Sequence, residues 1–267
     1  MASLVSPSAG SCRIRDWKKP TWPISSRNPD IDAICGKKPR MVILNRIDMA
    51  DADLVSRWSN YFKGKGMAVI RTDCKSRKGI NTFAPAVRQL LAEKLQRYAE
   101  KGQVGRPLKL MVVGIPNVGK STFINQIAGR KGAKAENRPG VTRGKQWVNV
   151  DGGLLLLDTP GILWPKFDDP EVGMRLAYTG AVKDDILDTE TLGCHLMELL
   201  AREYPGALTE RYKIEIPAEI DGWELLQAAG RKRGFLVSGG EVDTERMARV
   251  LLEEYRSCKL GTFTLER

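Results

Sequence analysis

The stretch that decides the fold is Gly114-Ile115-Pro116-Asn117-Val118-Gly119-Lys120-Ser121, which matches the pattern G-x-x-x-x-G-K-[ST] without departure. It follows the apolar run Leu108–Val113 and precedes a segment of helical pattern, which is the context that this pattern requires. Glycines here let the backbone N–H groups from Asn117 to Thr122 face phosphates at the positive end of a helix. The sequence therefore predicts a phosphate-binding loop in which Lys120 neutralises β- and γ-phosphates and the Ser121 hydroxyl binds Mg²⁺.

A second candidate site follows the apolar run Leu154–Leu157, where the sequence continues Asp158-Thr159-Pro160-Gly161. A carboxylate at the tip of a buried strand is costly unless it serves a cation, so we expect Asp158 to hold Mg²⁺ through water. The N–H of Gly161 is placed to meet the γ-phosphate. Thr142, in the loop before the hairpin, is expected to complete the Mg²⁺ shell when the γ-phosphate is present, with an ordinary turn threonine as the alternative.

Asn45-Arg46-Ile47-Asp48 ends an earlier apolar strand and resembles the guanine motif Asn-Lys-x-Asp of GTPases. The Asp48 carboxylate can accept two hydrogens from the guanine edge, and adenine offers no such pair. Arg46 stands in the lysine position, and the two cations are not equivalent there. After the next strand, Thr72-Asp73-Cys74-Lys75 falls where GTPases have Ser-Ala-Lys, so Asp73 and Cys74 are candidate guanine contacts.

The motifs run in permuted order, because the base motifs come before the phosphate motifs. This order, with the runs 25–29, 114–122 and 158–166, closely resembles ribosome biogenesis GTPase A over residues 25–267. The resemblance implies binding of GTP and GDP with Mg²⁺. It also implies slow GTP hydrolysis that the ribosome stimulates, in assembly of the large ribosomal subunit, with rRNA as a partner of a helical C-terminal domain.

Alternating strand and helix patterns predict an α/β fold, a P-loop GTPase domain with circularly permuted strand order, at residues 25–165. A small all-α domain, expected to bind RNA or the ribosome, follows at 166–267. Single helices are predicted at 51–63 and 85–99. Residues 1–24 show no periodicity and are expected to be irregular. They lack the strand with which the family's domain opens, so we expect a truncated or degenerate start, a gap in the sheet and low stability.

Catalysis has no obvious base. Ile162 stands where many small GTPases have a glutamine that positions water, and His195 is interpreted as a structural or surface residue. Catalysis would then depend on positioning and charge from Lys120, Thr142 and Gly161. Asn117 is a candidate contact for K⁺, with a plain polar loop residue as the alternative.

Three function classes remain open from the sequence. One is the ribosome-stimulated GTPase, in which the γ-phosphate switches rRNA binding through residues 162–190. The second is a nucleotide-gated rRNA-binding protein with negligible hydrolysis, because the family's N-terminal catalytic segment is missing. The third, a P-loop ATPase or kinase, is disfavoured by Asp48 and by the permuted order.

The composition limits the kinds of partner and compartment that we expect. A formal net charge of +11 favours polyanions, although charge alone leaves nucleic acid and a generically basic surface equally open. No apolar run approaches the ~20 residues of a membrane span, which argues against a membrane partner. The five cysteines are scattered, which suits a reducing compartment. We expect a cytoplasmic monomer.

Overall fold

The computed structural model of the chain describes residues 2–5, 27, 28, 30–129, 146–150, 153–161, 163, 170–182 and 188–263. The chain divides into two compact units. Unit 1 comprises Met1–Val172 and Phe263–Arg267, and unit 2 comprises Gly173–Thr262. The division thus falls after Val172 rather than after residue 165, where the sequence pattern changes.

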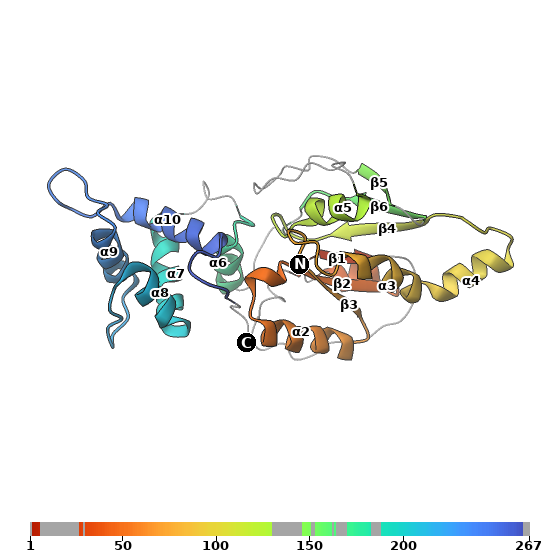
Figure 1. Ribbon diagram of the computed structural model, residues 1–267, viewed down its shortest axis with the longest axis horizontal. Coiled ribbons are helices and arrows are strands. Elements are labelled where there is room, and N and C mark those ends of the chain that lie inside the picture. The colour runs from red at the N-terminus through yellow and green to blue at the C-terminus, as the bar shows by residue number, and fades with distance from the viewer. Residues whose placement is uncertain are drawn as a thin grey trace. The chain divides into compact units, whose positions relative to one another are not determined.

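The described strands of unit 1 form a six-stranded sheet in the order β3-β2-β1-β4-β6-β5 (Figure 1). Their bounds are β1 (Ala2–Val5), β2 (Arg40–Asn45), β3 (Ala68–Thr72), β4 (Leu108–Val113), β5 (Gln146–Val150) and β6 (Leu154–Asp158). β2 is parallel to β3, β4 is parallel to β6, and β1 runs antiparallel to both β2 and β4. β2, β3, β4 and β6 therefore share one direction, so their carboxyl ends meet at one edge of the sheet, where ligands of such sheets bind.

β1 corrects the expectation that residues 1–24 are irregular and leave a gap in the sheet. Ala2–Val5 pairs with β2 on one side, where Ser3 lies opposite Val42, and with β4 on the other, where Ser3 lies opposite Val113. The backbone N–H and C=O groups of β2 and β4 would otherwise lack partners, and pairing them is the physical reason for this strand. Low stability caused by a missing strand is therefore no longer expected.

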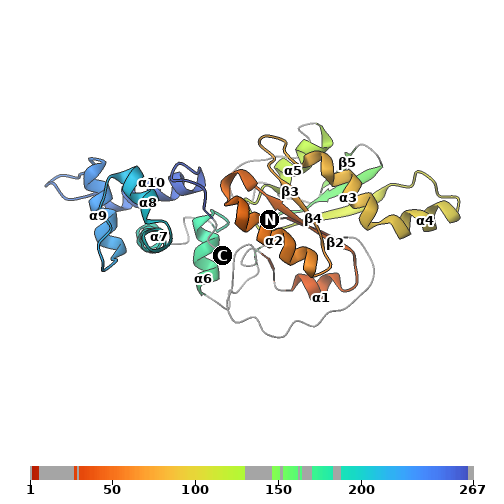
Figure 2. The same ribbon diagram turned by 60° about the horizontal axis from the view of Figure 1, so that its bottom comes forward.

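Helices cover both faces of the sheet (Figures 1 and 2). On one face, α3 (Phe83–Leu90), α4 (Ala92–Glu100) and α5 (Lys120–Ala128) pack on a core that includes Leu110, Leu156 and Phe123. On the other, α2 (Ala52–Gly64) packs Phe62 against Val42 and Leu44. Shorter elements are α1 (Ile31–Cys35) and the 3-10 turns η1 (Ile47–Met49) and η2 (Ile80–Thr82).

The predicted helix 51–63 is observed as α2, and Asp51 caps it by accepting hydrogen bonds from the N–H groups of Asp53 and Leu54. The predicted single helix 85–99 is wrong in one respect, because it is interrupted at Leu91, where ψ is 20°. The backbone bond from Leu91 to the Val87 carbonyl is retained across the break. Leu91 is buried in the core, as its helical spacing from Val87 predicts.

Unit 2 is helical in its described part. Its helices are the end of α6 (Pro170–Tyr178), α7 (Thr189–Glu203), α8 (Pro205–Tyr212), α9 (Gly222–Lys232) and α10 (Thr244–Arg256). α7 is the central helix, and it packs against α8, α9 and α10. Gly193 allows the close approach of α10, because a Cβ there would lie 2.5 Å from the Cβ of Ala248. None of the helices in the described ranges has the length and apolar character to cross a membrane.

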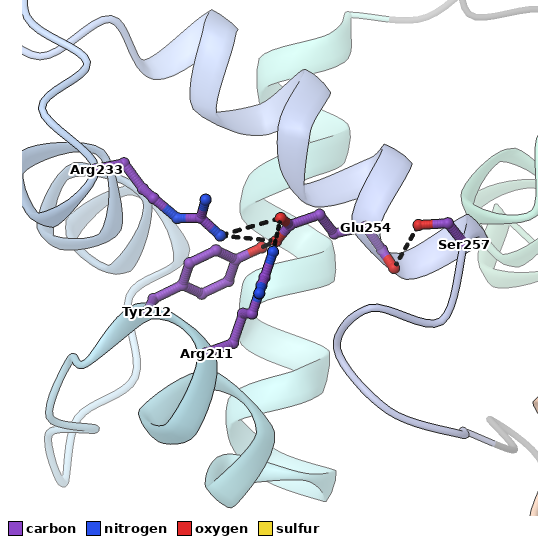
Figure 3. Close-up of polar contacts among 5 residues, drawn as sticks. All are labelled: Arg211, Tyr212, Arg233, Glu254 and Ser257. Carbon is purple, nitrogen blue, oxygen red and sulfur yellow. Dashed lines mark hydrogen bonds and ion pairs between the residues drawn. The ribbon is translucent and has the colours of Figure 1, made fainter.

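Unit 2 also holds a buried carboxylate, Glu254 of α10 (Figure 3). Arg211 pairs with it, and its Nε donates to Oε2 at 3.1 Å. Arg233 Nη2 donates to Oε1 at 3.0 Å and to Oε2 at 3.1 Å, and Tyr212 Oη donates to Oε2 at 2.9 Å. Although burial acts in the opposite direction, these bonds and charges lower the pKa of Glu254 to about 2. This cluster, which we call the Glu254 cluster, ties α8 and the end of α9 to α10.

Candidate nucleotide site

The phosphate-binding loop connects β4 to α5 at the shared carboxyl edge of unit 1. Gly119 precedes α5 with φ +88°, a left-handed conformation that favours glycine. A Cβ on Gly119 would lie only 2.5 Å from Nδ2 of Asn45, so a side chain there would displace the Asn45 amide from its hydrogen bond to the Val118 carbonyl. Asn117 also adopts a left-handed backbone, with φ 60°, and Ile115 is buried. The loop is thus held in one tight conformation by its own backbone and by β2.

Lys120 crosses the inside of this loop. Its side chain is only 6% exposed, and Nζ donates a hydrogen bond to the Ile115 carbonyl at 2.6 Å. Burial lowers the pKa of Lys120 to about 8, although the charge of Asp158 acts in the opposite direction. Within the described residues, the hydrogen-bond acceptor of this buried ammonium is a neutral carbonyl, so an anion bound beside it would offset the cost of burying the charge.

Asp158, at the end of β6, lies beside the first turn of α5. Ser121 Oγ donates to Asp158 Oδ2 at 3.1 Å. Asp158 is 1% exposed, and within the described residues its buried Oδ1 has no hydrogen-bond partner. Burial raises the pKa of Asp158, which the bond from Ser121 and the charge of Lys120 oppose. A buried carboxylate oxygen without a donor, next to a hydroxyl, is a donor set that fits Mg²⁺.

The segment after β6 packs directly on the phosphate loop. Thr159 Oγ donates to the carbonyl of Val112, in β4, at 2.7 Å. A Cβ on Gly161 would lie 2.6 Å from both Cα and N of Pro116. Only glycine therefore allows this backbone to approach the loop so closely.

Asn45 joins the base motif to the phosphate loop. Its Nδ2 donates to the Val118 carbonyl at 3.0 Å, while its Oδ1 accepts from Thr72 Oγ at 3.1 Å and from Cys74 Sγ at 3.0 Å. One side chain thus connects the carboxyl ends of β2 and β3 with the loop after β4. Sequence reasoning treated Asn45 as a base contact and did not identify Thr72, a buried threonine at the end of a strand, as its partner.

The remaining base-site residues lie at the same edge. Arg46, with φ 60°, and Asp48 are exposed in the turn after β2, and Ile47 begins η1 between them. Asp73 is engaged in its own loop, where it accepts from the N–H groups of Lys75 at 2.8 Å and Ser76 at 3.2 Å. Burial raises the pKa of Cys74 to about 11, which keeps this thiol protonated as a donor to Asn45.

Two candidate residues, Thr142 and Ile162, lie outside the described residues. Val118 and Thr122 are half-buried in the loop and in the first turn of α5. His195 is exposed on α7 of unit 2, which agrees with its interpretation as a surface residue. Within the described residues no group of three or more His, Cys, Asp or Glu side chains forms a metal cage, so a cation here would depend on a few protein oxygens and on phosphate.

Known proteins resemble the chain over nearly its whole length. A family profile described as 50S ribosome-binding GTPase matches residues 109–204. Ribosome biogenesis GTPase A of Priestia megaterium is 46% identical over 246 residues, covering 91% of this chain and 85% of that protein. Mitochondrial ribosome-associated GTPase 1 of Mus musculus is 31% identical over 265 residues, covering 92% and 80%. A GDP-bound structure of YlqF, 25% identical, has a TM-score of 0.64 and covers 92% of this chain and 89% of that one.

These matches confirm the predicted fold class, a P-loop GTPase domain with circularly permuted strands followed by helices. They also make the protein a GTPase, with GTP and GDP as its ligands. The identity to the Priestia megaterium protein extends across both units of the chain. The chain belongs to the ribosome biogenesis GTPase A family.

Proposed function

We propose that this GTPase hydrolyses GTP slowly by itself, is stimulated by the ribosome, and acts in assembly of the large ribosomal subunit, with Mg²⁺ as cofactor and rRNA as partner. The observation that carries the nucleotide chemistry is the buried, unpartnered Oδ1 of Asp158 beside Ser121 and Lys120, within the described residues. Family membership supports the ribosomal role. We further propose a cytoplasmic monomer, in which unit 2 takes part in binding the ribosome.

The proposed roles in the phosphate site follow from charge and position. Lys120 neutralises the β- and γ-phosphates, and backbone N–H groups from Asn117 to Thr122 bind phosphate oxygens. Ser121 and Asp158 hold Mg²⁺, with Thr142 completing the shell. The N–H of Gly161 binds the γ-phosphate. Bound Mg²⁺ supplies charge stabilisation, and the residues of the chain supply position and exclude water, which is most of what phosphoryl transfer requires.

The proposed base contact predicts a switch in specificity. Replacing Asp48 with asparagine is expected to weaken GTP binding about 100-fold, because hydrogen bonds to a charged group contribute about 1.5–3 kcal/mol each and asparagine keeps only one acceptor. Xanthine nucleotides should gain affinity, since the asparagine amide can donate to the xanthine carbonyl. Competition of GTP, ATP and XTP against a fluorescent GDP analogue measures this. Asp53→Asn, at an exposed position of α2, is the matched control.

Either of two results would contradict this assignment. The first is a wild-type protein that prefers ATP to GTP. The second is an Asp48→Asn variant that keeps the wild-type affinity for GTP.

We propose that Asn117, in the phosphate-binding loop, contacts K⁺ at the phosphates. GTP hydrolysis is then expected to be roughly 10-fold faster in K⁺ than in Na⁺ at equal ionic strength. K⁺ would stabilise charge at the phosphates as an arginine finger does, and an arginine finger raises kcat by about 10³–10⁵. Asn117→Ala should remove the difference between the two salts. Equal rates for the wild-type protein in both salts would rule out this role.

Nucleotide-dependent binding to the ribosome tests the proposed partner. Purified large ribosomal subunits are pelleted with the protein loaded with a non-hydrolysable GTP analogue or with GDP. We expect the analogue form to pellet and the GDP form to stay largely in solution, since the γ-phosphate orders the segment that contains Gly161. Equal pelleting of both forms would contradict a switch. The second candidate function, a nucleotide-gated rRNA-binding protein with negligible hydrolysis, shares this behaviour and differs only in turnover.

A further inference from the structure

The positive charge of the chain is concentrated in unit 1. Of the 43 Lys and Arg residues, 31 lie in residues 1–172 and 263–267, together with 16 of the 32 Asp and Glu residues. The helical unit, residues 173–262, holds the other 12 basic and 16 acidic residues. The GTPase unit is therefore strongly basic, whereas the helical unit is net acidic. Polyanion binding depends on basic charge, so the charge balance favours the GTPase unit as the place of an RNA contact.

Within unit 1, the loop Asp73–Gly79 carries three exposed cations in four residues, Lys75, Arg77 and Lys78. We call it the basic loop. Its one carboxylate, Asp73, is buried and accepts hydrogen bonds from the loop itself. These bonds hold the pKa of Asp73 below its usual range, although burial acts in the opposite direction. Among the described residues, no carboxylate oxygen lies within ion-pair distance of the three cations.

The conformation of the basic loop is fixed. The Asp73 N–H donates to the Lys78 carbonyl at 3.0 Å, which closes the loop. Gly79, with φ +76°, packs so closely that a Cβ there would lie 2.0 Å from the carbonyl oxygen of Arg71. Arg77 is held at φ 63°, a conformation that a non-glycine residue adopts at some cost. A closed loop presents its cations at low entropic cost, because little backbone freedom is left to lose on binding.

The basic loop also adjoins the nucleotide site. Cys74, the residue before Lys75, donates to Asn45, and Asn45 donates to Val118 of the phosphate loop. The three cations are therefore attached to the edge that holds the nucleotide. The phosphates of the nucleotide are expected to be bound by Lys120 and the phosphate loop, not by the basic loop. An RNA backbone, single-stranded or duplex, presents a row of phosphates that three exposed cations can bind together.

We propose that the basic loop, through Lys75, Arg77 and Lys78, is an RNA-binding surface of the GTPase unit, and that it binds phosphates of the RNA backbone. This inference rests on the proposed function, because it assigns the rRNA contact to specific residues. It also assigns the dominant electrostatic contact to unit 1 rather than to the helical unit. Binding through phosphates carries no base specificity, so the loop positions the protein on RNA and does not select a sequence.

The test compares two triple variants of the full chain with the wild type. One neutralises the basic loop, with Lys75→Gln, Arg77→Gln and Lys78→Gln. The other neutralises three exposed cations of the helical unit, with Arg231→Gln, Lys232→Gln and Lys259→Gln. Binding of a fluorescein-labelled RNA hairpin is measured by fluorescence anisotropy over a range of KCl concentrations. Circular dichroism confirms that both variants are folded. A double variant with only Arg77→Gln and Lys78→Gln, which leaves the base motif 72–75 intact, is expected to bind a fluorescent GDP analogue within about 3-fold of the wild type.

We expect the basic-loop variant to lose at least about 10-fold in RNA affinity. The slope of log K against log salt should become shallower by about 2–3, near one unit for each RNA phosphate that the variant no longer binds. The helical-unit variant should keep the wild-type slope. An equal or larger loss in the helical-unit variant would overturn the inference, as would unchanged RNA binding in the basic-loop variant. Wild-type binding to vesicles containing phosphatidylglycerol, without binding to the hairpin, would overturn it too.

Stimulation of GTP hydrolysis by large subunits, measured on the same three proteins, separates the basic loop from the proposed function. If large subunits stimulate the wild-type protein but the basic-loop variant binds the hairpin as the wild type does, the proposed function stands. The RNA-binding role of the basic loop is then refuted. Unstimulated wild-type protein would refute the proposed function, while the hairpin titrations would still decide whether the basic loop binds RNA.

Discussion

Replacing Lys120 with methionine is expected to weaken GTP binding at least about 100-fold, because bonds from this ammonium to two phosphates contribute about 1.5–3 kcal/mol each. Methionine has nearly the same length and no charge. The nucleotide-free variant should be as stable as the wild type or more stable, since the wild-type protein carries the cost of burying an ammonium whose main partner is the Ile115 carbonyl. Titration with a fluorescent GTP analogue and thermal unfolding measure the two effects.

The stability effect depends on pH in a definite direction. Folding lowers the pKa of Lys120 from 10.5 to about 8, so between these values the unfolded chain binds more protons than the folded protein. The wild-type protein therefore gains stability as pH rises through this window, and the advantage of the Lys120→Met variant shrinks. Lys63→Met, at an exposed position of α2, is the control and should change neither property. Retained GTP affinity, or a marked fall in the melting temperature of the Lys120→Met variant, would contradict the proposed role of Lys120.

Replacing Glu254 with alanine is expected to destabilise the helical unit by about 1.5–3 kcal/mol, the usual contribution of hydrogen bonds to a charged group, because Arg211 and Arg233 are 36% and 30% exposed and can be rehydrated. Arg211 and Arg233 would lose their shared carboxylate, and the Tyr212 hydroxyl would lose its acceptor in a buried position (Figure 3). Because unit 1 has its own core, GTP affinity should be retained. Circular dichroism during thermal unfolding, with GTP titration beside it, measures this.

Glu253→Ala changes the neighbouring residue of α10, which is exposed, and should shift stability by no more than about 0.5 kcal/mol. The pKa of Glu254 lies near 2, below its ordinary 4.5, so its contribution is complete above pH 4.5 and is lost as pH falls toward 2. An unchanged melting temperature at neutral pH in the Glu254→Ala variant would show that the Glu254 cluster does not stabilise unit 2.

Local patterns predicted the strands and motifs well, because their signals lie within a few residues. The apolar runs that became β2 and β4, the helix that became α2 and the phosphate loop are all read from neighbouring positions. β1 was missed because Ala2–Val5 is short and has no strand pattern of its own. It forms a strand because it pairs with β2 and β4, which are distant in sequence. The break at Leu91 was missed because the spacing of Val87, Leu91 and Leu95 is that of an uninterrupted helix.

The sequence predicts which residues belong to the candidate site better than it predicts the hydrogen bonds between them. The phosphate loop and Asp158 were predicted as site residues because their residue types and spacing are typical of phosphate and Mg²⁺ binding. The three bonds of Asn45 were not, since they join residues 27 to 73 positions apart in sequence. The Glu254 cluster has the same character, with partners 21 to 43 positions away. The acidic balance of the helical unit was visible in the sequence, but it gained meaning only once the chain was divided at Val172.

The most direct test of the proposed function is the rate of GTP hydrolysis with and without purified large ribosomal subunits, at matched Mg²⁺ and K⁺. We expect slow turnover by the protein alone and a clear increase when subunits are added, with the Lys120→Met variant inactive in both conditions. A rate that subunits leave unchanged would contradict the proposed ribosome-stimulated GTPase. Undetectable hydrolysis in both conditions, with GTP-dependent binding to the subunit retained, would instead favour the nucleotide-gated rRNA-binding protein.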